Sequence, residues 1–126
     1  MSKLLLGLFA FFLLFMVAKP TEASTYTEIR RVPRANCVAF AKSVRPDLNL
    51  KTRDGWARTI KTNTQVPAIG SIVLTRESWT GHVAYVVDID YQRGELILAE
   101  QNYKRGYYTV GRRLPLTSRK IVGYVG

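Results

Sequence analysis

Cys37 and His82 are the only cysteine and the only histidine of this chain, and together these two residue types can perform nucleophilic catalysis. Around Cys37, apolar residues at positions 37, 40, 41 and 44 have the spacing of a helix with one buried face. Asn36 is a typical N-cap, so Cys37 is expected at the first helical position. There the free amide groups and the helix dipole stabilise a thiolate, which makes the sulfur a nucleophile near neutral pH.

The N-terminal stretch has the pattern of a signal peptide. Lys3 is followed by an apolar run of 15 residues, Leu4–Ala18, which is shorter than the roughly 18–20 residues that span a bilayer. We expect residues 1–23 to be a signal peptide and residues 24–126 to form one domain in the secreted, periplasmic or envelope fraction. An uncleaved N-terminal membrane anchor is the alternative.

Export bears on how Cys37 is interpreted. A lone cysteine is most often a small core residue. In an oxidising compartment structural cysteines form disulfides, and this chain offers no second cysteine. An unpaired thiol in an exported protein indicates a reactive residue or an intermolecular link.

The chain is strongly basic, with a formal net charge of +10. Without residues 1–23 it keeps 17 basic and 8 acidic residues, a net charge of +9. Such a charge attracts polyanions, whether wall polymers, an anionic membrane surface or nucleic acid. The basic residues are dispersed and no nucleic-acid-binding motif occurs, so nucleic acid is the least expected partner. The single cysteine and histidine do not have the spacing of a zinc site, so neither a metal nor another cofactor is expected.

The periodicity predicts helices first and strands afterwards. Pro46 is expected to end the first helix, and residues 54–61 are expected to form a second helix capped by Asp54, with Trp56 and Ile60 on one face. Residues 24–33 are expected to be a polar lead-in. Strands are expected at residues 71–75, 82–89, 95–102, 107–110 and 121–124. This order predicts an α+β domain with an antiparallel sheet.

The turn between the second and third strands decides what His82 can meet. A type I turn with Gly94 in the bulge position leaves a three-residue loop. In that register His82 shares a face with Glu100 and Asn102, and Asn102 is the nearer. Either side chain would fix the tautomer of the imidazole and support its protonated form. Cys37, His82 and a polar partner would then make a Cys-His-polar hydrolase site.

Four blocks of the sequence resemble the CHAP family, the cysteine- and histidine-dependent amidohydrolases and peptidases. In the family's order they are residues 36–41 (NCVAFA), 67–73 (PAIGSIV), 81–86 (GHVAYV) and 99–103 (AEQNY). The resemblance implies a papain-like α+β fold, with N-terminal helices packed on the antiparallel sheet, and cleavage of amide bonds in bacterial peptidoglycan.

The resemblance also implies a role for each site residue. Cys37 would be the nucleophile and His82 the general base and later the general acid. Glu100 would orient His82, and Asn102 would be a further polar member of the site. The backbone N–H of Cys37 would help to hold the oxyanion.

Two positions differ from the pattern that the family shows. The residue before the nucleophile is commonly glutamine and is Asn36 here, a shorter amide that we assign to oxyanion or substrate binding. The aspartate that is usual after Pro-x-x-Gly is Ser71. Trp79, in the loop before His82, is a further candidate for substrate binding.

The sequence therefore predicts a peptidoglycan hydrolase, either an N-acetylmuramoyl-L-alanine amidase or an endopeptidase of the peptide stems and bridges. The alternative is a catalytically inactive basic protein on the same scaffold that binds wall polymer, nucleic acid or a partner protein. A third reading is the sister class of cell-wall γ-D-glutamyl endopeptidases, against which the Glu-x-Asn element at Glu100 argues. The sequence says nothing about the oligomeric state.

Overall fold

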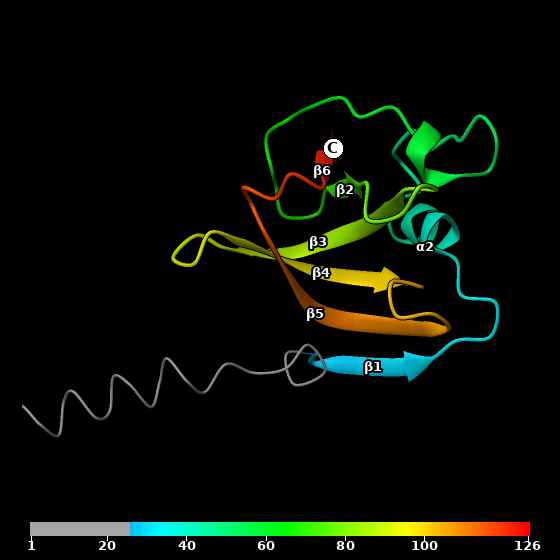
Figure 1. The fold of residues 1–126 in the computed structure, drawn as a ribbon, viewed down its shortest axis with the longest axis horizontal. Helices are drawn as coiled ribbons and strands as arrows, with labels where there is room; N and C mark the ends of the chain where they lie inside the picture. The colour runs from blue at the N-terminus through cyan, green and yellow to red at the C-terminus, as the bar shows by residue number, and fades with distance from the viewer. Residues whose placement is uncertain (1–25) are drawn as a thin grey trace, which may run out of the picture.

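The computed structural model describes residues 26–126, which form a six-stranded antiparallel sheet with one α-helix packed on it (Figure 1). The strand order is β1-β5-β4-β3-β2-β6. The elements are β1 (Glu28–Arg31), α2 (Cys37–Val44), the 3₁₀ turn η2 (Ala57–Thr59), β2 (Ile72–Thr75), β3 (His82–Asp90), β4 (Glu95–Gln101), β5 (Tyr107–Pro115) and β6 (Ile121–Val125). The predicted α+β class with an antiparallel sheet is confirmed, whereas the signal peptide expected at residues 1–23 lies outside the described residues.

Helix α2 begins and ends where the sequence predicts. The side chain of Asn36 accepts a hydrogen bond from the N–H of Ala39 at 3.0 Å, which makes it the N-cap and places Cys37 at the first helical position. The helix stops after Val44, because Arg45 precedes Pro46 and leaves the helical region, with φ −132° and ψ 69°.

The second predicted helix is wrong. Residues 54–61 contain only the short turn η2. The Asp54 carboxylate accepts the N–H of Trp56 at 3.0 Å and pairs with Arg58 at 2.7 Å, which closes a local turn instead of capping a helix. Gly55 has φ +88°, which is incompatible with a right-handed helix. One helix rather than several therefore packs on the sheet, and the papain-like topology stays a prediction.

Strand β1 was not predicted, because residues 24–33 were expected to be only a polar lead-in to the helix. Its four residues, Glu28–Arg31, are all exposed, and they pair antiparallel with residues 107–110 of β5 at the edge of the sheet. An edge strand with no buried face has no apolar alternation to reveal it.

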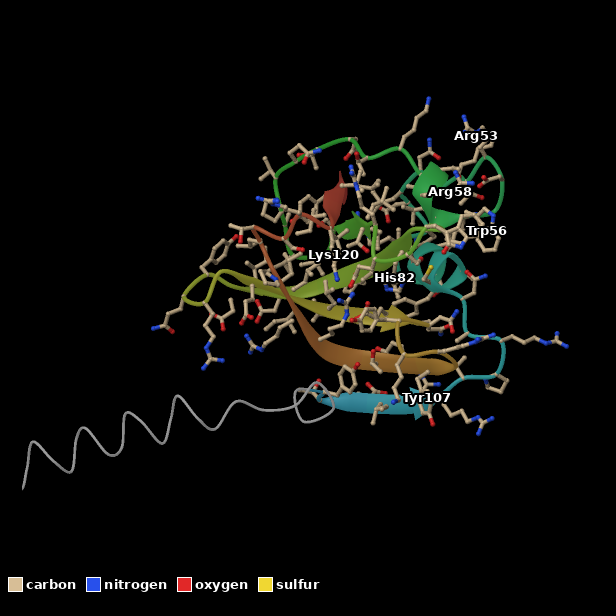
Figure 2. All side chains as sticks on the ribbon, in the orientation of Figure 1. Arg53, Trp56, Arg58, His82, Tyr107 and Lys120 are labelled. Atoms are coloured by element: carbon tan, nitrogen blue, oxygen red, sulfur yellow. The ribbon has the colours of Figure 1, made fainter. Side chains whose placement is uncertain are left out.

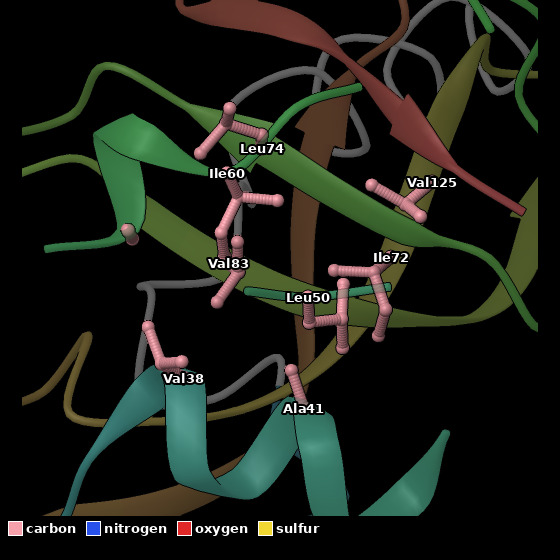
Figure 3. Close-up of a cluster of buried hydrophobic side chains, with 9 residues drawn as sticks. Val38, Ala41, Leu50, Ile60, Ile72, Leu74, Val83 and Val125 are labelled. Carbon is pink, nitrogen blue, oxygen red and sulfur yellow. The ribbon is translucent and has the colours of Figure 1, made fainter. Parts of the chain in front are cut away.

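Apolar side chains form one cluster on each face of the sheet. Helix α2 covers the first cluster, shown in Figure 3 and composed of Val38, Ala41, Leu50, Ala57, Ile60, Ile72, Leu74, Val83 and Val125. The second lies on the other face and contains Val73, Ala84, Val86, Ile89, Leu96, Leu98, Leu114 and Tyr124. The burial of these side chains fixes α2 against the sheet, and with it the position of Cys37.

In the β3–β4 hairpin, His82 and Glu100 share one face as predicted, but the register differs from the predicted one. Its turn has four residues, 91–94, with Asp90 paired to Glu95, instead of the predicted three. One more residue in the turn would place His82 and Glu100 on opposite faces. A bulge at Val87, between the Val86 and Asp88 pairings, adds a residue to β3 and restores the parity. His82 and Glu100 therefore do share a face.

Candidate active site

Cys37 and His82 meet where the start of α2 lies against the start of β3. Each is the first residue of its element. The thiol of Cys37 lies close enough to the His82 side chain and to the backbone of Val83 for both to lower its pKa, and Cys37 and His82 line the same cleft. Figure 2 shows the labelled His82 beside α2. Two residues 45 positions apart in the sequence are thus neighbours in the structure.

Glu100 is the polar partner of His82. The Nε2 atom of His82 is 2.7 Å from Oε1 of Glu100, and both side chains are buried, with Glu100 fully so. Because Nε2 faces the carboxylate, Nδ1 is the ring nitrogen left for the thiol of Cys37. The three side chains form a line in which the carboxylate can hold the imidazole and support its positive charge.

The electrostatics of this line favour a thiolate beside an imidazolium. Burial alone would raise the pKa of the Cys37 thiol, but the hydrogen bond and positive charge of His82 outweigh it, so that this pKa is lowered. Burial alone would likewise lower the pKa of His82. Hydrogen bonds to Cys37 and Glu100 and the two negative charges raise that pKa to about 9. Both shifts favour the charged forms, a thiolate beside an imidazolium, and the thiolate is the form in which a cysteine is a nucleophile.

Arg112 completes the site and was missed by the sequence analysis. Its Nε and one terminal nitrogen donate to the two oxygens of Glu100, each at 2.8 Å. The guanidinium also donates to both oxygens of Glu77, each at 2.9 Å. The predicted strand ended at Val110, before this residue. Gly111, a glycine inside an extended pattern, was the available sign that a bulge continues the strand.

Gly81 brings the loop before His82 against η2. The N–H of Arg58 donates to the carbonyl of Thr80 at 2.9 Å. A Cβ added to Gly81 would lie 2.5 Å from the backbone nitrogen of Arg58, and the φ of Gly81 is +77°. Only glycine fits this position, so the place of His82 depends on the contact between the loop and η2.

Asn36 and Asn102 both line a cleft beside Cys37, of about 160 Å³. Asn36 uses its side-chain oxygen for the helix cap, and its own N–H donates to Gln101 at 3.2 Å. The side-chain oxygen of Asn102 accepts the N–H of Gly106 at 2.9 Å and closes the turn between β4 and β5. Its φ of +69° turns the chain out of β4. Glu100 rather than Asn102 therefore contacts the imidazole.

Trp79 does not line this cleft, but its neighbour Trp56 does. The centres of the two rings lie 5.7 Å apart, and their planes are at an angle of 56°. Trp79 is 75% exposed and Trp56 is 46% exposed. The guanidinium of Arg58 lies over the Trp79 ring at 5.8 Å. The sequence predicted Trp56 on the face of a helix, whereas the structure places it at the rim of the site. An exposed aromatic pair at the rim of a cleft that also holds Cys37 is suited to contacting a ligand.

A second, larger cleft is basic. It measures about 420 Å³ and is lined by Asn49, Lys51, Thr52, Arg53, Thr59 and Lys61. None of its three cationic residues takes part in an ion pair with a described acidic side chain. Figure 2 shows Arg53 and Trp56 on the same side of the molecule. The cleft has the charge to receive an anion.

Residues 26–126 contain neither a candidate metal site nor a membrane-spanning helix. No group of three or more His, Cys, Asp or Glu side chains is arranged to hold a metal ion in this range. No helix in the same range has the length and apolar character to cross a bilayer.

Comparison with known families identifies the domain. The family model of the CHAP domain matches residues 28–102, which include Cys37, His82 and Glu100 and stop before Arg112. No curated protein and no solved structure shows a significant match to the chain.

Proposed function

The chain belongs to the CHAP domain family of peptidoglycan-associated amidases and peptidases, and from this membership we propose that it hydrolyses amide bonds of bacterial peptidoglycan with Cys37 as nucleophile. The observation that carries the proposal is the line from the thiol through His82 to Glu100, closed by the 2.7 Å contact between Nε2 and Oε1. The bond would be that of an N-acetylmuramoyl-L-alanine amidase or of a stem or bridge endopeptidase.

In the proposed first step, the Cys37 thiolate attacks the carbonyl carbon of the scissile amide. Negative charge then develops on the carbonyl oxygen. The N–H of Cys37 lies at the helix start, where backbone amides have no intrahelical acceptor. Asn36 lines the same cleft and uses its side-chain oxygen for the cap, which leaves its side-chain NH₂ as a second donor. These two donors would hold the oxyanion. The His82 imidazolium passes its proton to the departing amine, and a thioester on Cys37 remains.

In the second step, water hydrolyses the thioester. His82, now neutral, takes a proton from the attacking water, and the collapse of the second tetrahedral intermediate releases the carboxylic acid and the Cys37 thiolate. Glu100 stays ionised throughout, because the Arg112 guanidinium holds the pKa of this buried carboxyl below its usual range. It keeps the imidazole in place and supports its positive charge.

The decisive experiment is digestion of purified peptidoglycan by the parent and by Cys37→Ala. We expect the variant to lose at least about 10³-fold in rate, because no other described thiol can replace the nucleophile. Mass spectrometry of the released muropeptides would identify the cleaved bond from the new termini. Alkylation of the single cysteine should abolish cleavage. If Cys37→Ala clears peptidoglycan as fast as the parent, Cys37 is not the nucleophile. If the parent binds peptidoglycan without clearing it, the protein is instead the inactive binding protein.

We also propose that Trp56 and Trp79 contact the substrate beside the cleft. Sugar rings and apolar side chains both stack on exposed aromatic faces. Trp79→Ala should raise the KM for a soluble muropeptide about 5- to 10-fold with little change in kcat. Tyr91→Ala is the matched control, since Tyr91 is 73% exposed and lies in the turn between β3 and β4. Equal effects of both variants would contradict the assignment.

Residues 1–23 are proposed to direct export of the domain to the cell envelope. The support is the apolar run Leu4–Ala18 and its small and polar flank. N-terminal sequencing of the protein recovered from the producing cell should begin at Ser24. Recovery of the intact N-terminus from the membrane fraction would favour the anchor.

A further inference from the structure

Arg112 joins two carboxylates that reach it from different elements. Glu100 lies on β4, and Glu77 lies in the loop between β2 and β3. The Arg112 side chain is 6% exposed, against 8% for Glu77 and 0% for Glu100. Four hydrogen bonds of 2.8–2.9 Å connect the guanidinium to the two acids. A fork bonded to both oxygens of a carboxylate fixes its plane as well as its position.

The backbone of β5 is shaped to present Arg112 to Glu100. Along an even strand, residues 109 and 112 would point to opposite faces. Gly111, at φ +115°, is the extra residue of a bulge, so that Thr109 pairs with Glu100 and Arg112 pairs with Leu98 on the same face. The residue that brings Arg112 to the site is therefore a bulge glycine beyond the stretch that the family model covers.

The same cluster leaves little room for solvent. The Tyr103 ring lies 3.5 Å from the Arg112 guanidinium carbon and 5.8 Å from the His82 ring. Thr75 donates a hydrogen bond to Glu77 at 2.9 Å, so Glu77 is also held. In such a poorly hydrated site, the charge on each group is felt strongly by the next.

We propose that Arg112 and Glu77 are positioning residues, which hold the Glu100 carboxylate against His82 and set how much of its negative charge the imidazole experiences. This positioning role bears on catalysis only if the domain is the proposed hydrolase. The charge effects among the side chains hold whether or not it is. The positive charge of Arg112 offsets the negative charge of Glu100. Glu77 shares the same guanidinium and so weakens this offset.

The groups that face His82 come from every element around it. Cys37 approaches from α2 and Glu100 from β4, Tyr103 lies in the turn after β4, and Arg112 stands behind Glu100. Both Cys37 and Glu100 raise the pKa of His82, to about 9, against the effect of burial. Changing Arg112 or Glu77 removes neither of the two direct partners, Cys37 and Glu100, and alters the charge behind Glu100.

Two substitutions should therefore move His82 in opposite directions. In Arg112→Gln the full charge of Glu100 acts on His82, and the pKa of the imidazole should rise. In Glu77→Gln the guanidinium is committed to Glu100, and the pKa of His82 should fall. We expect displacements of about half a pH unit or more each way. A loss of packing alone would lower activity without producing opposite displacements.

The measurement does not need a substrate. His82 is the only histidine, so its ring protons give one titrating NMR signal of this kind, and Cys37 is the only cysteine, so the alkylation rate against pH reports a single thiolate. Arg113→Gln and Glu95→Gln are matched controls. Arg113 and Glu95 form an ion pair of 3.2 Å that is partly exposed, and their loss changes the net charge equally. Both controls should titrate like the parent.

Arg112→Gln leaves two buried acids without their cation, which lowers the fraction of protein that folds. Arg112→Lys then serves in its place, because it keeps the charge but cannot bond both oxygens of two carboxylates, and it should give a smaller upward displacement. Unchanged titration of His82 in both Glu77→Gln and the folded Arg112 variant would overturn the proposal. Shifted titration in a protein that does not cleave peptidoglycan would retain it and reject the hydrolase function.

Discussion

The charge state of two residues, Cys37 and His82, decides what the site can do at neutral pH. The pKa of Cys37 is lowered and that of His82 is raised to about 9. The two shifts widen the pH range over which the thiolate and the imidazolium exist together. A cysteine in this state attacks a carbonyl without first losing a proton to a base, so the chemistry starts from the resting protein.

This charge state predicts a bell-shaped dependence of kcat/KM on pH. The acid limb follows protonation of the Cys37 thiolate, and the alkaline limb, near pH 9, follows loss of the His82 proton. Alkylation of Cys37 should already be fast at pH 7. Glu100→Gln should shift the alkaline limb to lower pH, because it removes a charge that raises the pKa of His82. It should also reduce kcat by about 10²- to 10⁴-fold. An alkylation rate that rises only above pH 8, as for an ordinary thiol, would contradict the ion pair.

The same residue links stability to pH. Because the pKa of His82 is higher in the folded state than its ordinary value of 6.5, the stabilisation is fully present below pH 6.5 and is lost as the pH rises through about 9. For His82 alone this amounts to roughly 3 kcal/mol. The lowered pKa of Cys37 acts in the opposite direction over the same range, so the loss is measured as the difference between the parent and His82→Gln in urea unfolding at pH 6 and pH 10.

At the scale of elements, the sequence predicted what local patterns determine. Helix α2 follows from an N-cap, a periodic apolar face and a proline, all within about ten residues of one another. The five predicted strands exist, with boundaries that shift by a few residues or, for β5, by five. Resemblance to four short blocks identified the family, and the family match confirms it.

What the sequence did not predict depends on irregularities in the strands. The turn of the β3–β4 hairpin is one residue longer than expected, and the bulge at Val87 compensates for it. The common face of His82 and Glu100 was thus predicted from a register that is wrong. The bulge at Gly111 likewise brings in Arg112, from a strand that was predicted to end at Val110. Bulges depend on packing across strands and leave little trace in local periodicity.

The contact between the loop before His82 and η2 makes a prediction about Gly81. Gly81→Ala places a methyl group 2.5 Å from the Arg58 nitrogen and strains a backbone with φ +77°. We expect a loss of at least about 2 kcal/mol in unfolding free energy, together with reduced activity, because His82 follows directly. Gly94→Ala is the matched control, with φ +67° and open space around its Cβ. It should cost only about 1 kcal/mol, and equal losses would show that the contact with Arg58 is unimportant.

At the scale of the whole molecule, the basic residues behind the net charge of +10 are unevenly distributed. Many of them are dispersed over the surface. The cleft lined by Lys51, Arg53 and Lys61 concentrates three cations in one concave place. We propose that it binds the anionic polymers that accompany peptidoglycan and so keeps the domain on its substrate.

This proposal predicts a local effect of charge. Replacing Lys51, Arg53 and Lys61 together by Gln should weaken binding to wall preparations that carry anionic polymer by about tenfold at low salt, and added salt should diminish the difference. Cleavage of a soluble muropeptide should change little. The control removes the same charge from three exposed and separate positions, Lys42, Arg105 and Arg119. Equal weakening by both triple variants would show that only the overall charge matters.

The position of β1 sets a limit on how far the N-terminus can be trimmed. Backbone groups of β5 are paired with residues 28–31, and the N–H of Thr27 donates to the carbonyl of Val110 at 2.8 Å. A cut after Ala23 leaves this strand whole. A protease that removed a few residues more would uncover the outer edge of β5, and bare strand edges join to those of other molecules. Trimming within β1 would therefore make the protein prone to aggregate, while Cys37, His82 and Glu100 are all still present.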